Sequence, residues 1–311
     1  MKFDIAIILI NYNSSPHSIN CIDSIIEKTS KKLNYQIIIT DNCSEKEDYL
    51  KLKAFCDTIG FPNLQLYRSL INTGFGGGNM HGVQYANAQY LAFINNDTLL
   101  INDCLSILKN ALENNTNIGI AGAQSYRESG KQLISIDHYT SPVKQIFGRR
   151  FLESINAKKF PKRKKKYTTI LQANTVSGSF MFVRASDFYK VGGFDTNIFL
   201  YYEETDLCKR LEKNNKFAYL IPEAEFIHYH GISTPKSILI KTELKISLLY
   251  VIRKHYGYFS YLFLLNFLRI NYLFTTLFKP KYWYLFKVLL AGAPLSKSLK
   301  QKQKIINLDF D

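Results

Sequence analysis

The chain has 311 residues, 46% hydrophobic and 21% charged, a composition that excludes a disordered protein and can supply a sizeable core. Its five cysteines are scattered, odd in number and without a CxxC pair, which excludes a disulfide scaffold and indicates a reducing compartment. The net charge of +15 is uneven. Residues 1–147 carry 12 Lys/Arg against 13 Asp/Glu, residues 148–234 carry 15 against 9, and residues 235–311 carry 13 against 3. The C-terminal quarter is therefore expected to meet an anionic partner, such as a membrane surface, a lipid phosphate or nucleic acid.

The first 125 residues alternate apolar runs with helical patterns. Strands are predicted at 3–10, 35–40, 63–67, 90–94 and 118–123, and helices from about Pro16 and over 46–59, 77–88 and 102–114. The first two strands are near-continuous Ile/Leu runs, which are typical of strands buried on both faces. The β-α-β order predicts an α/β fold with a parallel sheet and right-handed crossovers.

A second segment, at about 170–235, has a strand at 176–183, a helix at 203–214 and another strand at 217–222. Between the two segments lies the densest run of positive charge, residues 158–166, which we interpret as a mobile surface loop.

From residue 236 onward the chain is basic and rich in aromatic residues. Residues 258–278 are long enough to span a bilayer, but Asn266, Arg269 and Asn271 lie near the middle of this stretch. Three alternatives stay open: a helical pair packed on the globular domain, a helix lying in the membrane interface, and a transmembrane span.

Polar residues or glycines follow four consecutive predicted strands. These stretches are Asn11-Tyr12-Asn13, Asp41-Asn42-Cys43-Ser44, Asn72 to Asn79, and Asn95-Asn96-Asp97-Thr98. Ligands of open α/β sheets bind outside the carboxyl ends of the strands. Any one stretch is explained by turn chemistry, but four together favour a nucleotide pocket.

The glycine-rich stretch fails two motif tests. Gly74-x-Gly76 is followed by Asn79 where the dinucleotide fingerprint needs a third glycine, and Gly77 and Gly82 are followed by Val83 where a P-loop needs Lys. A dehydrogenase and an ATPase are therefore disfavoured. The glycine-rich stretch can still bring its backbone close to a ligand. It also lies at the start of a predicted helix, whose N-terminus favours anions.

Asp97 is the best candidate for a metal ligand, because Mg²⁺ or Mn²⁺ takes one or two carboxylates together with ligand phosphates. The structural alternative is that Asp97 caps the next helix. His228 and His230 follow a strand and would face one side if the chain stays extended, so each is either a ligand to metal or phosphate or a structural residue.

Three carboxylates, Glu203, Glu204 and Asp206, lie at one predicted helix start. The structural interpretation is a favourable interaction with the helix dipole, with an i,i+4 pair between Asp206 and Arg210. The functional interpretation is that crowded carboxylates raise one pKa, which suits a general base.

Taken together, these motifs resemble inverting nucleotide-sugar glycosyltransferases of family 2, which have the GT-A fold. More narrowly, they resemble the rhamnosyltransferase-like members that build bacterial cell-surface polysaccharides. The matching stretches are IILINYNSS at 7–15, TDNCS at 40–44, NTGFGGGNMHG at 72–82, FINNDT at 93–98, SGSFMFVRASDFYKVGGFDTNIFLYYEETDLCKRL at 177–211 and IHYHGIS at 227–233. The resemblance covers about residues 3–255.

The resemblance implies roles for individual residues on the donor side. Asp41 would bind the nucleobase beside the backbone of Asn11, Tyr12 and Asn13. Asn72, Gly74 and Asn79 would line the nucleotide and the diphosphate. Asn95, Asn96 and Asp97 would occupy the Asp-x-Asp site of the family, with Asp97 holding Mg²⁺ or Mn²⁺ and His228 holding the metal or the diphosphate.

On the acceptor side, Gly178 and the turn Gly193-Phe194-Asp195 would border the sugar and the acceptor, and Glu204 would be the general base. Two departures bear on these roles. Only the last carboxylate of the Asp-x-Asp site is kept, so metal affinity would be modest. Glu204 is one methylene longer than the usual Asp, which leaves Glu203 and Asp206 open as the base.

The resemblance therefore implies a GT-A domain at 1–235, with a donor-binding half at about 1–125 and an acceptor and base half at about 170–235. A helical, basic region follows at 236–311. The expected reaction transfers a sugar, with rhamnose suggested by the narrower resemblance, to a glycan or lipid-linked acceptor at the inner face of the cytoplasmic membrane. No nucleic acid is expected, because no recognisable module accompanies the charge. The alternatives are a sugar nucleotidyltransferase and a non-enzymatic binder of anionic polymers.

Overall fold

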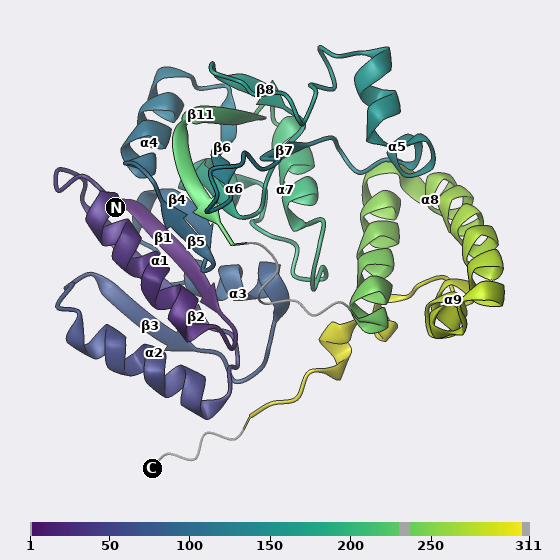
Figure 1. The fold of residues 1–311 in the computed structure, drawn as a ribbon, viewed down its shortest axis with the longest axis horizontal. Coiled ribbons are helices and arrows are strands. Elements are labelled where there is room, and N and C mark those ends of the chain that lie inside the picture. Colours follow the sequence, from purple (N-terminus) through teal and green to yellow (C-terminus); the bar gives the residue numbers. More distant parts are fainter. Residues whose placement is uncertain (1, 230–236, 307–311) are drawn as a thin grey trace.

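The computed structural model describes residues 2–229 and 237–306, which form one mixed sheet with helices on both faces and a helical C-terminal region beside it (Figure 1). The strand order is β3-β2-β1-β4-β10-β6-β11-β5, with β8 paired to β11, and β7 and β9 form a small second sheet. The strands are β1 (Phe3–Asn11), β2 (Tyr35–Asp41), β3 (Leu64–Arg68), β4 (Ala88–Asn95), β5 (Thr98–Leu100), β6 (Ile118–Tyr126), β7 (Ile136–Asp137), β8 (Leu171–Ala173), β9 (Thr175–Val176), β10 (Phe180–Arg184) and β11 (Phe217–His228).

Helices cover both faces of this sheet. They are α1 (Ser15–Lys28), α2 (Lys46–Thr58), α3 (Gly74–Val83), α4 (Cys104–Asn114), α5 (Pro142–Ile155), α6 (Ala185–Lys190), α7 (Glu203–Glu212), α8 (Ile238–Phe278) and α9 (Trp283–Leu290). Alternate residues of β1 point to opposite faces, so Ile7 packs in the cluster under α1 and α4, whereas Ile8 packs in the cluster under α3 and α7. Burial on both faces explains the near-continuous apolar run of this strand.

The parallel order expected from the first 125 residues is confirmed, because β3, β2, β1 and β4 pair in parallel. The second half differs. The strand predicted at 176–183 is divided: β9 pairs with β7, and β10 then inserts antiparallel between β4 and β6. β11 runs on to His228 and pairs antiparallel with the short strand β5, which was not among the predicted strands.

The helix expected at 77–88 begins earlier, at Gly74, and ends at Val83. Its glycines allow the helix to lie directly on the sheet. A Cβ on Gly82 would lie 2.8 Å from Ile8 Cγ2, and a Cβ on Gly78 would lie 3.1 Å from Ile10 Cδ1. Close packing of helix on strand is therefore one physical reason for this glycine-rich composition.

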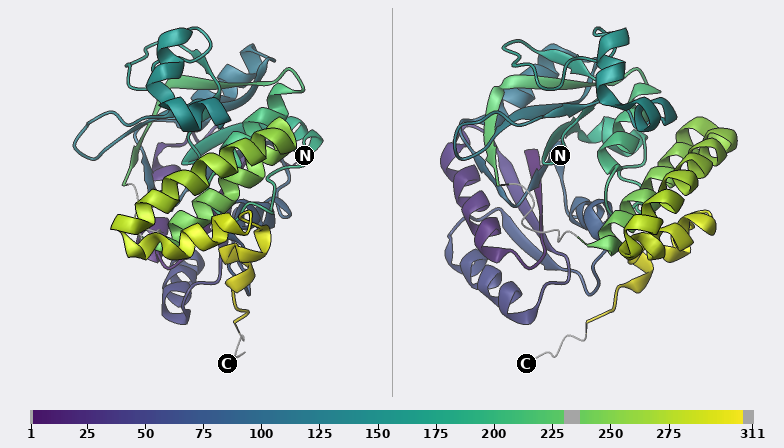
Figure 2. Two further views of the ribbon diagram at one scale, coloured as in Figure 1. Left: turned by 90° about the vertical axis from the view of Figure 1, so that its right-hand side faces the viewer. Right: turned by 45° about the vertical axis from the view of Figure 1, so that its right-hand side comes forward.

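The C-terminal region is a helical assembly built on α8. α8 bends at Gly257, where φ is +84°, and its two halves pack with α9 around a separate apolar cluster (Figure 2). Arg269 donates to the carbonyls of Leu289 and Leu290 at the end of α9, at 3.0 and 2.9 Å. This contact accounts for an arginine in the middle of an apolar stretch.

Among the described residues, α8 is the one helix whose length and composition would suffice to cross a membrane. Its second half leaves apolar side chains exposed, including Phe259 at 86% and Phe278 at 83%. α8 and α9 form a helical packing on the globular part of the chain, in line with the first of the three alternatives; whether this face meets a membrane stays a prediction.

Candidate functional site

The carboxyl ends of β1 and β2 carry a buried polar network. Asn11 Nδ2 donates to Asp41 Oδ1 at 2.9 Å and to Asp48 Oδ2 at 2.8 Å. Arg68 Nε lies 3.5 Å from Asp41 Oδ2, and the backbone N–H of Ser44 donates to the same oxygen. Asn11 and Asp41 are fully buried, so the network fixes the strand ends from which the predicted nucleobase contact would be made.

The loop before α3 is held by Asn42, a residue that sequence reasoning did not select although it directly follows Asp41. Asn42 Nδ2 donates to Asn72 Oδ1 and to Gly74 O, both at 3.1 Å, and its Oδ1 accepts from the Thr73 N–H at 3.0 Å. Gly74 has a φ of +74°, and a Cβ there would lie 2.1 Å from Phe199 O. The loop is therefore locked between the end of β2 and the segment that leads into α7.

The remaining predicted donor residues surround this loop. Tyr12 is 37% exposed, and Asn13 Oδ1 accepts from the Glu45 N–H at 2.7 Å. Asn79 donates from its side chain to Phe75 O, and Gly178 lies next to the Phe75 ring, with 3.9 Å between a Cβ on Gly178 and Phe75 Cζ. These placements are compatible with a donor site but leave each role a prediction.

Asp97 and His228 lie next to each other. Both were predicted, from different parts of the sequence, to hold a metal or the diphosphate. Antiparallel pairing of β5 with β11 sets His228 opposite Thr98, and His228 Nε2 lies 3.1 Å from Asp97 Oδ1. Asn96 donates to the hydroxyls of Ser14 and Ser18, both at 2.7 Å, which secures the turn after β4. Asp97 does not cap α4, because the N-cap of that helix is Asp103. His230 lies outside the described residues.

The carboxylate oxygen of Asp97 suits Mg²⁺ or Mn²⁺, and the imidazole of His228 beside it favours a transition metal, so the pair fits Mn²⁺ better than Mg²⁺. Within 2–229 and 237–306, no three His, Cys, Asp or Glu side chains form a metal-binding group. The protein would thus supply two ligands at this position, and a divalent cation bound there would need donor phosphates or water to complete its coordination. This fits the expectation of modest metal affinity.

Two adjacent glutamates begin α7. Glu203 is 3% exposed, and burial together with the Glu204 charge raises its pKa well above the usual range. The pKa of Glu204 is raised by burial and by the charge of Asp137, and Lys144 opposes that rise. A Cβ on Gly76 would lie 3.7 Å from Glu203 Cγ, so Glu203 at the start of α7 lies next to the glycine-rich helix of the donor half.

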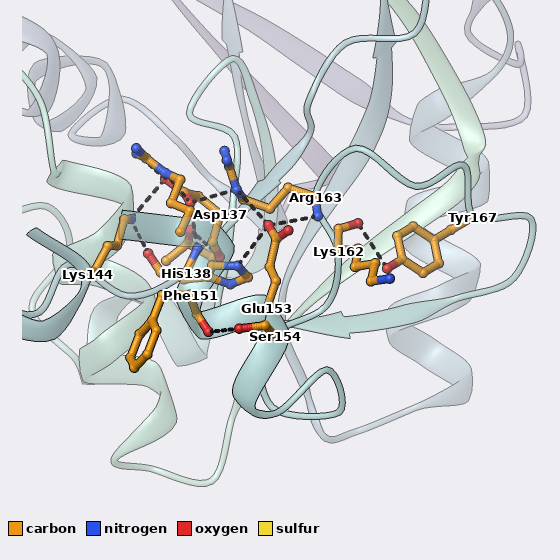
Figure 3. A network of polar contacts seen from close by, with 11 residues as sticks. Asp137, His138, Lys144, Phe151, Glu153, Ser154, Lys162, Arg163 and Tyr167 are labelled. Atoms are coloured by element: carbon orange, nitrogen blue, oxygen red, sulfur yellow. Dashed lines mark hydrogen bonds and ion pairs between the residues drawn. The ribbon is translucent and has the colours of Figure 1, made fainter. Parts of the chain in front are cut away.

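Asp137 and Lys144, which act on the pKa of Glu204, belong to a charged network that no sequence pattern indicates; Figure 3 shows this network. Asp137, at the end of β7, accepts from Lys144 at 2.9 Å and from Arg149 at 2.8 Å. Arg163, from the basic run, lies 3.2 Å from Glu153 and 3.6 Å from Asp137. Burial raises the pKa of Asp137, but Arg149 and Lys144 outweigh it and hold this pKa below its usual range. The basic run is therefore tied to β7 and α5 at Arg163, and the mobility of its other residues stays a prediction.

Asp206 lies in a different environment from the two glutamates. Its buried carboxylate contacts Arg210, Lys254 and His255, each at 2.7 Å, which lowers its pKa. The predicted Asp206–Arg210 pair is confirmed. A carboxylate held by three partners and kept ionised is poorly suited to accept a proton, so the environment argues against Asp206 as the base.

The turn predicted to border the acceptor is also tied to the C-terminal region. Asp195 accepts from Tyr250 at 2.8 Å and from Lys254 at 2.6 Å. Phe194 is buried among aromatic rings, and Gly193 packs tightly against Met80, with 2.6 Å between a Cβ there and Met80 Sδ. The side chain of Phe194 thus belongs to the core, and a role of this turn next to an acceptor stays a prediction.

Comparison with known proteins agrees with this geometry. Residues 6–192 match the family described as Glycosyl transferase family 2. The chain is 31% identical over 243 residues to the rhamnosyltransferase WbbL of Escherichia coli K12, covering 74% of this chain and 88% of that one. Over 59 residues it is 44% identical to an N-acetylglucosaminyl-diphospho-decaprenol L-rhamnosyltransferase of Mycobacterium tuberculosis, 19% of each chain.

Among solved structures, the mannosyltransferase PcManGT of Pyrobaculum calidifontis, in complex with GDP-Man and Mn²⁺, superposes with a TM-score of 0.54. The match covers 96% of this chain and 87% of that one at 13% identity, so it shows a shared fold. The architecture is the expected GT-A-like sheet with flanking helices, to which a long C-terminal helix is added.

Proposed function

The chain belongs to glycosyltransferase family 2, and on that premise we propose that it transfers a sugar from a nucleoside diphosphate to a hydroxyl of a lipid-linked or cell-surface glycan. Rhamnose is the proposed sugar, because the relative matched over most of the chain is a rhamnosyltransferase. A second relative is named for a sugar linked to a lipid through a diphosphate, which supports a lipid-linked acceptor. The observation that carries the proposal is the contact of the Glu203–Glu204 segment with the glycine-rich helix.

We assign proton removal to Glu204. The oxygen of the acceptor hydroxyl attacks the anomeric carbon, its proton passes to the Glu204 carboxylate, and the bond to the departing nucleoside diphosphate breaks on the opposite face. One displacement inverts the configuration. Glu203, whose pKa is raised further, would stay protonated, which leaves the negative charge on Glu204.

Asp97 and His228 would hold the divalent cation. Such a cation, when bound, neutralises charge that develops on the leaving diphosphate. The chain itself contributes the N-terminus of α3, whose helix dipole favours anionic groups, whereas the N–H groups of Thr73 and Gly74 are already bonded within the loop. The backbone next to Asn11 and Asp41, whose buried side chains fix the strand ends, would receive the nucleobase.

The proposed place of action is the inner face of the cytoplasmic membrane. The C-terminal residues 235–311 carry 13 Lys/Arg against 3 Asp/Glu, and Phe259, Phe263 and Phe278 of α8 are exposed. Exposed aromatic residues beside basic ones suit the headgroup region of an anionic membrane. A peripheral association there would bring the enzyme to lipid-linked acceptors.

Thermal unfolding with UDP-, dTDP- and GDP-sugars, each with and without Mn²⁺, tests the donor site. A ligand at 100 times its Kd stabilises the fold by about 2.7 kcal/mol. We expect one sugar nucleotide to give a Mn²⁺-dependent shift that is lost in Asp97→Asn. A folded protein that responds to none of the donors would refute the proposal.

Product analysis then separates the reaction classes. A glycosyltransferase releases nucleoside diphosphate, whereas a sugar nucleotidyltransferase releases pyrophosphate. Glu204→Gln should bind the donor with the wild-type shift and lose transfer, on the order of 10²-fold or more. Full transfer activity in this variant would move the base assignment to Glu203.

A further inference from the structure

We propose that α5 and the basic run after it form a second membrane-contact surface, in which exposed apolar side chains enter the interface and a lysine-lined hollow binds lipid phosphates. The inference rests on the proposed function, since it places the acceptor side of the same enzyme on an anionic bilayer. It concerns residues 142–167, which lie outside the C-terminal region to which membrane contact was assigned above.

The first observation is an exposed apolar stripe on α5. Val143, Phe147, Phe151 and Ile155 recur every four residues, and they are 43%, 61%, 40% and 57% exposed. α5 bends at Gly148, where φ is +81°, yet the rings of Phe147 and Phe151 stay in contact across the bend with centroids 5.0 Å apart. Exposed apolar side chains on both halves of α5, joined by the ring contact across the bend, mark an interaction surface.

The second observation is the hollow that follows the helix. It has a volume of about 540 Å³ and is lined by Lys158, Lys162 and Lys165 together with apolar and aromatic residues, namely Ala157, Pro161, Tyr167 and Leu171. Within the described part of the chain, none of the three lysines forms an ion pair with a carboxylate. Three unneutralised ammonium groups around one hollow suit a phosphate group.

The third observation is charge. Residues 142–167 contain ten Lys/Arg and one Glu, a higher density of positive charge than in the C-terminal region. Lys144 and Arg149 tie α5 to Asp137 of β7, and Arg163 ties the loop to Asp137 and to Glu153 of α5 (Figure 3). The remaining cations are thus presented from an anchored scaffold.

The fourth observation is the position of the surface. α5 contacts α8, and the left view of Figure 2 looks onto the side where α5 lies above α8 and α9. The exposed aromatic residues Tyr258 and Phe259 follow directly on the bend of α8 at Gly257. A bilayer can therefore engage α5 together with the C-terminal helices.

These features favour a bilayer over nucleic acid as the partner. Basic residues alone would suit either polyanion. Burial of an apolar side chain lowers the free energy only if the partner offers an apolar layer, and a bilayer interface does so. This applies to the exposed side chains of α5, namely Val143, Phe147, Phe151 and Ile155. Lysine stems can cross that layer while their ammonium groups remain at the phosphates.

The test is co-sedimentation of the full chain with vesicles of phosphatidylcholine alone and of phosphatidylcholine mixed with phosphatidylglycerol, at low and high salt. The variant is the triple neutralisation Lys158→Gln, Lys162→Gln and Lys165→Gln. Its matched control neutralises three exposed lysines of the donor half, Lys31→Gln, Lys32→Gln and Lys51→Gln.

We expect the hollow variant to bind phosphatidylglycerol vesicles on the order of 10²-fold more weakly than wild type, and the control to lose far less. Phe147→Ser should weaken vesicle binding several-fold at both low and high salt, because Phe147 contributes through apolar burial, which salt does not screen. The control Leu50→Ser, on α2, should leave vesicle binding unchanged. Equal vesicle binding by the hollow variant and the control would overturn the proposal.

Two further outcomes would also overturn it. Inorganic pyrophosphate that displaces the protein from vesicles at low concentration would indicate a site for a free phosphate compound. Tight binding to duplex DNA that the hollow variant loses, with vesicle binding unchanged, would indicate a nucleic-acid surface. The Mn²⁺-dependent shift with sugar nucleotides is measured on the same variants, so failure of donor binding and failure of this surface are told apart.

Discussion

Replacing Asp206 by Asn distinguishes an anchoring carboxylate from a catalytic one. The carboxylate is fully buried and contacts Arg210, Lys254 and His255, each at 2.7 Å. The amide keeps the shape but removes the charge, which leaves Arg210 and the buried His255 without this carboxylate and leaves Lys254 with Asp195 alone. Breaking a buried ion pair from one side costs about 3–5 kcal/mol. We expect the free energy of unfolding to fall by about this amount, a large fraction of the total for a protein.

Chemical denaturation of wild type and Asp206→Asn measures this loss, with Glu204→Gln as the matched control. The same chemical change at Glu204 removes a carboxylate whose ionisation is opposed by burial, so stability should stay equal or rise while transfer is lost. If Asp206→Asn proves as stable as wild type and loses only transfer, Asp206 is a base and the reasoning is refuted.

The pH dependence gives an independent check on the same residue. Because its partners lower the folded-state pKa of Asp206 below the unfolded value of about 3.9, its contribution is present above that pH. The contribution is lost as the pH falls further toward the folded pKa. The stability difference between wild type and Asp206→Asn should therefore shrink below about pH 4 and stay constant near neutrality.

Three further predictions follow from single side chains. Glu203→Gln should raise the melting temperature at neutral pH. The pKa of Glu203 is raised in the folded state, so the wild-type protein loses stability as the pH rises above the pKa of an unfolded glutamate, about 4.3. In more acidic solution the difference in melting temperature between variant and wild type should vanish. Gly74→Ala should destabilise the protein by about 2–4 kcal/mol, because the new Cβ would lie 2.1 Å from Phe199 O and the backbone there is left-handed. The variant should also bind the donor more weakly in a thermal-shift titration. A titration curve like that of wild type would contradict this. Arg269→Leu should cost about 1–3 kcal/mol by leaving carbonyls of α9 unsatisfied, whereas a gain in denaturant midpoint would show that helix packing outweighs these bonds.

Local pattern was enough to predict the first half of the fold. The apolar runs that became β1 and β2 are buried on both faces, so their composition alone identifies them. The sequence also predicted that the polar residues after these strands lie near one another, because parallel strands have their carboxyl ends at the same edge of the sheet. Residues such as Asp41 and Asp97 could therefore be selected from their place in the sequence alone.

Other predictions failed because they depended on contacts between distant segments. The glycine stretch of α3 is helical from Gly74, a position that propensity disfavours, because close approach to β1 and to Phe199 outweighs the entropic cost of glycine. The strand β5 has three residues and exists only because β11 pairs with it. No local signal announces either arrangement.

The sequence by itself thus determined the α/β class, the edge of the sheet that carries the polar residues, and the identity of the carboxylates worth testing. Only the tertiary structure decided what each carboxylate can do. Asp206 faces Lys254 and His255, some fifty residues further along the chain, and is held ionised, whereas Glu203 is buried beside the charge of Glu204. A pKa depends on burial and on charges within a few ångströms, and three-dimensional folding alone determines which charges those are.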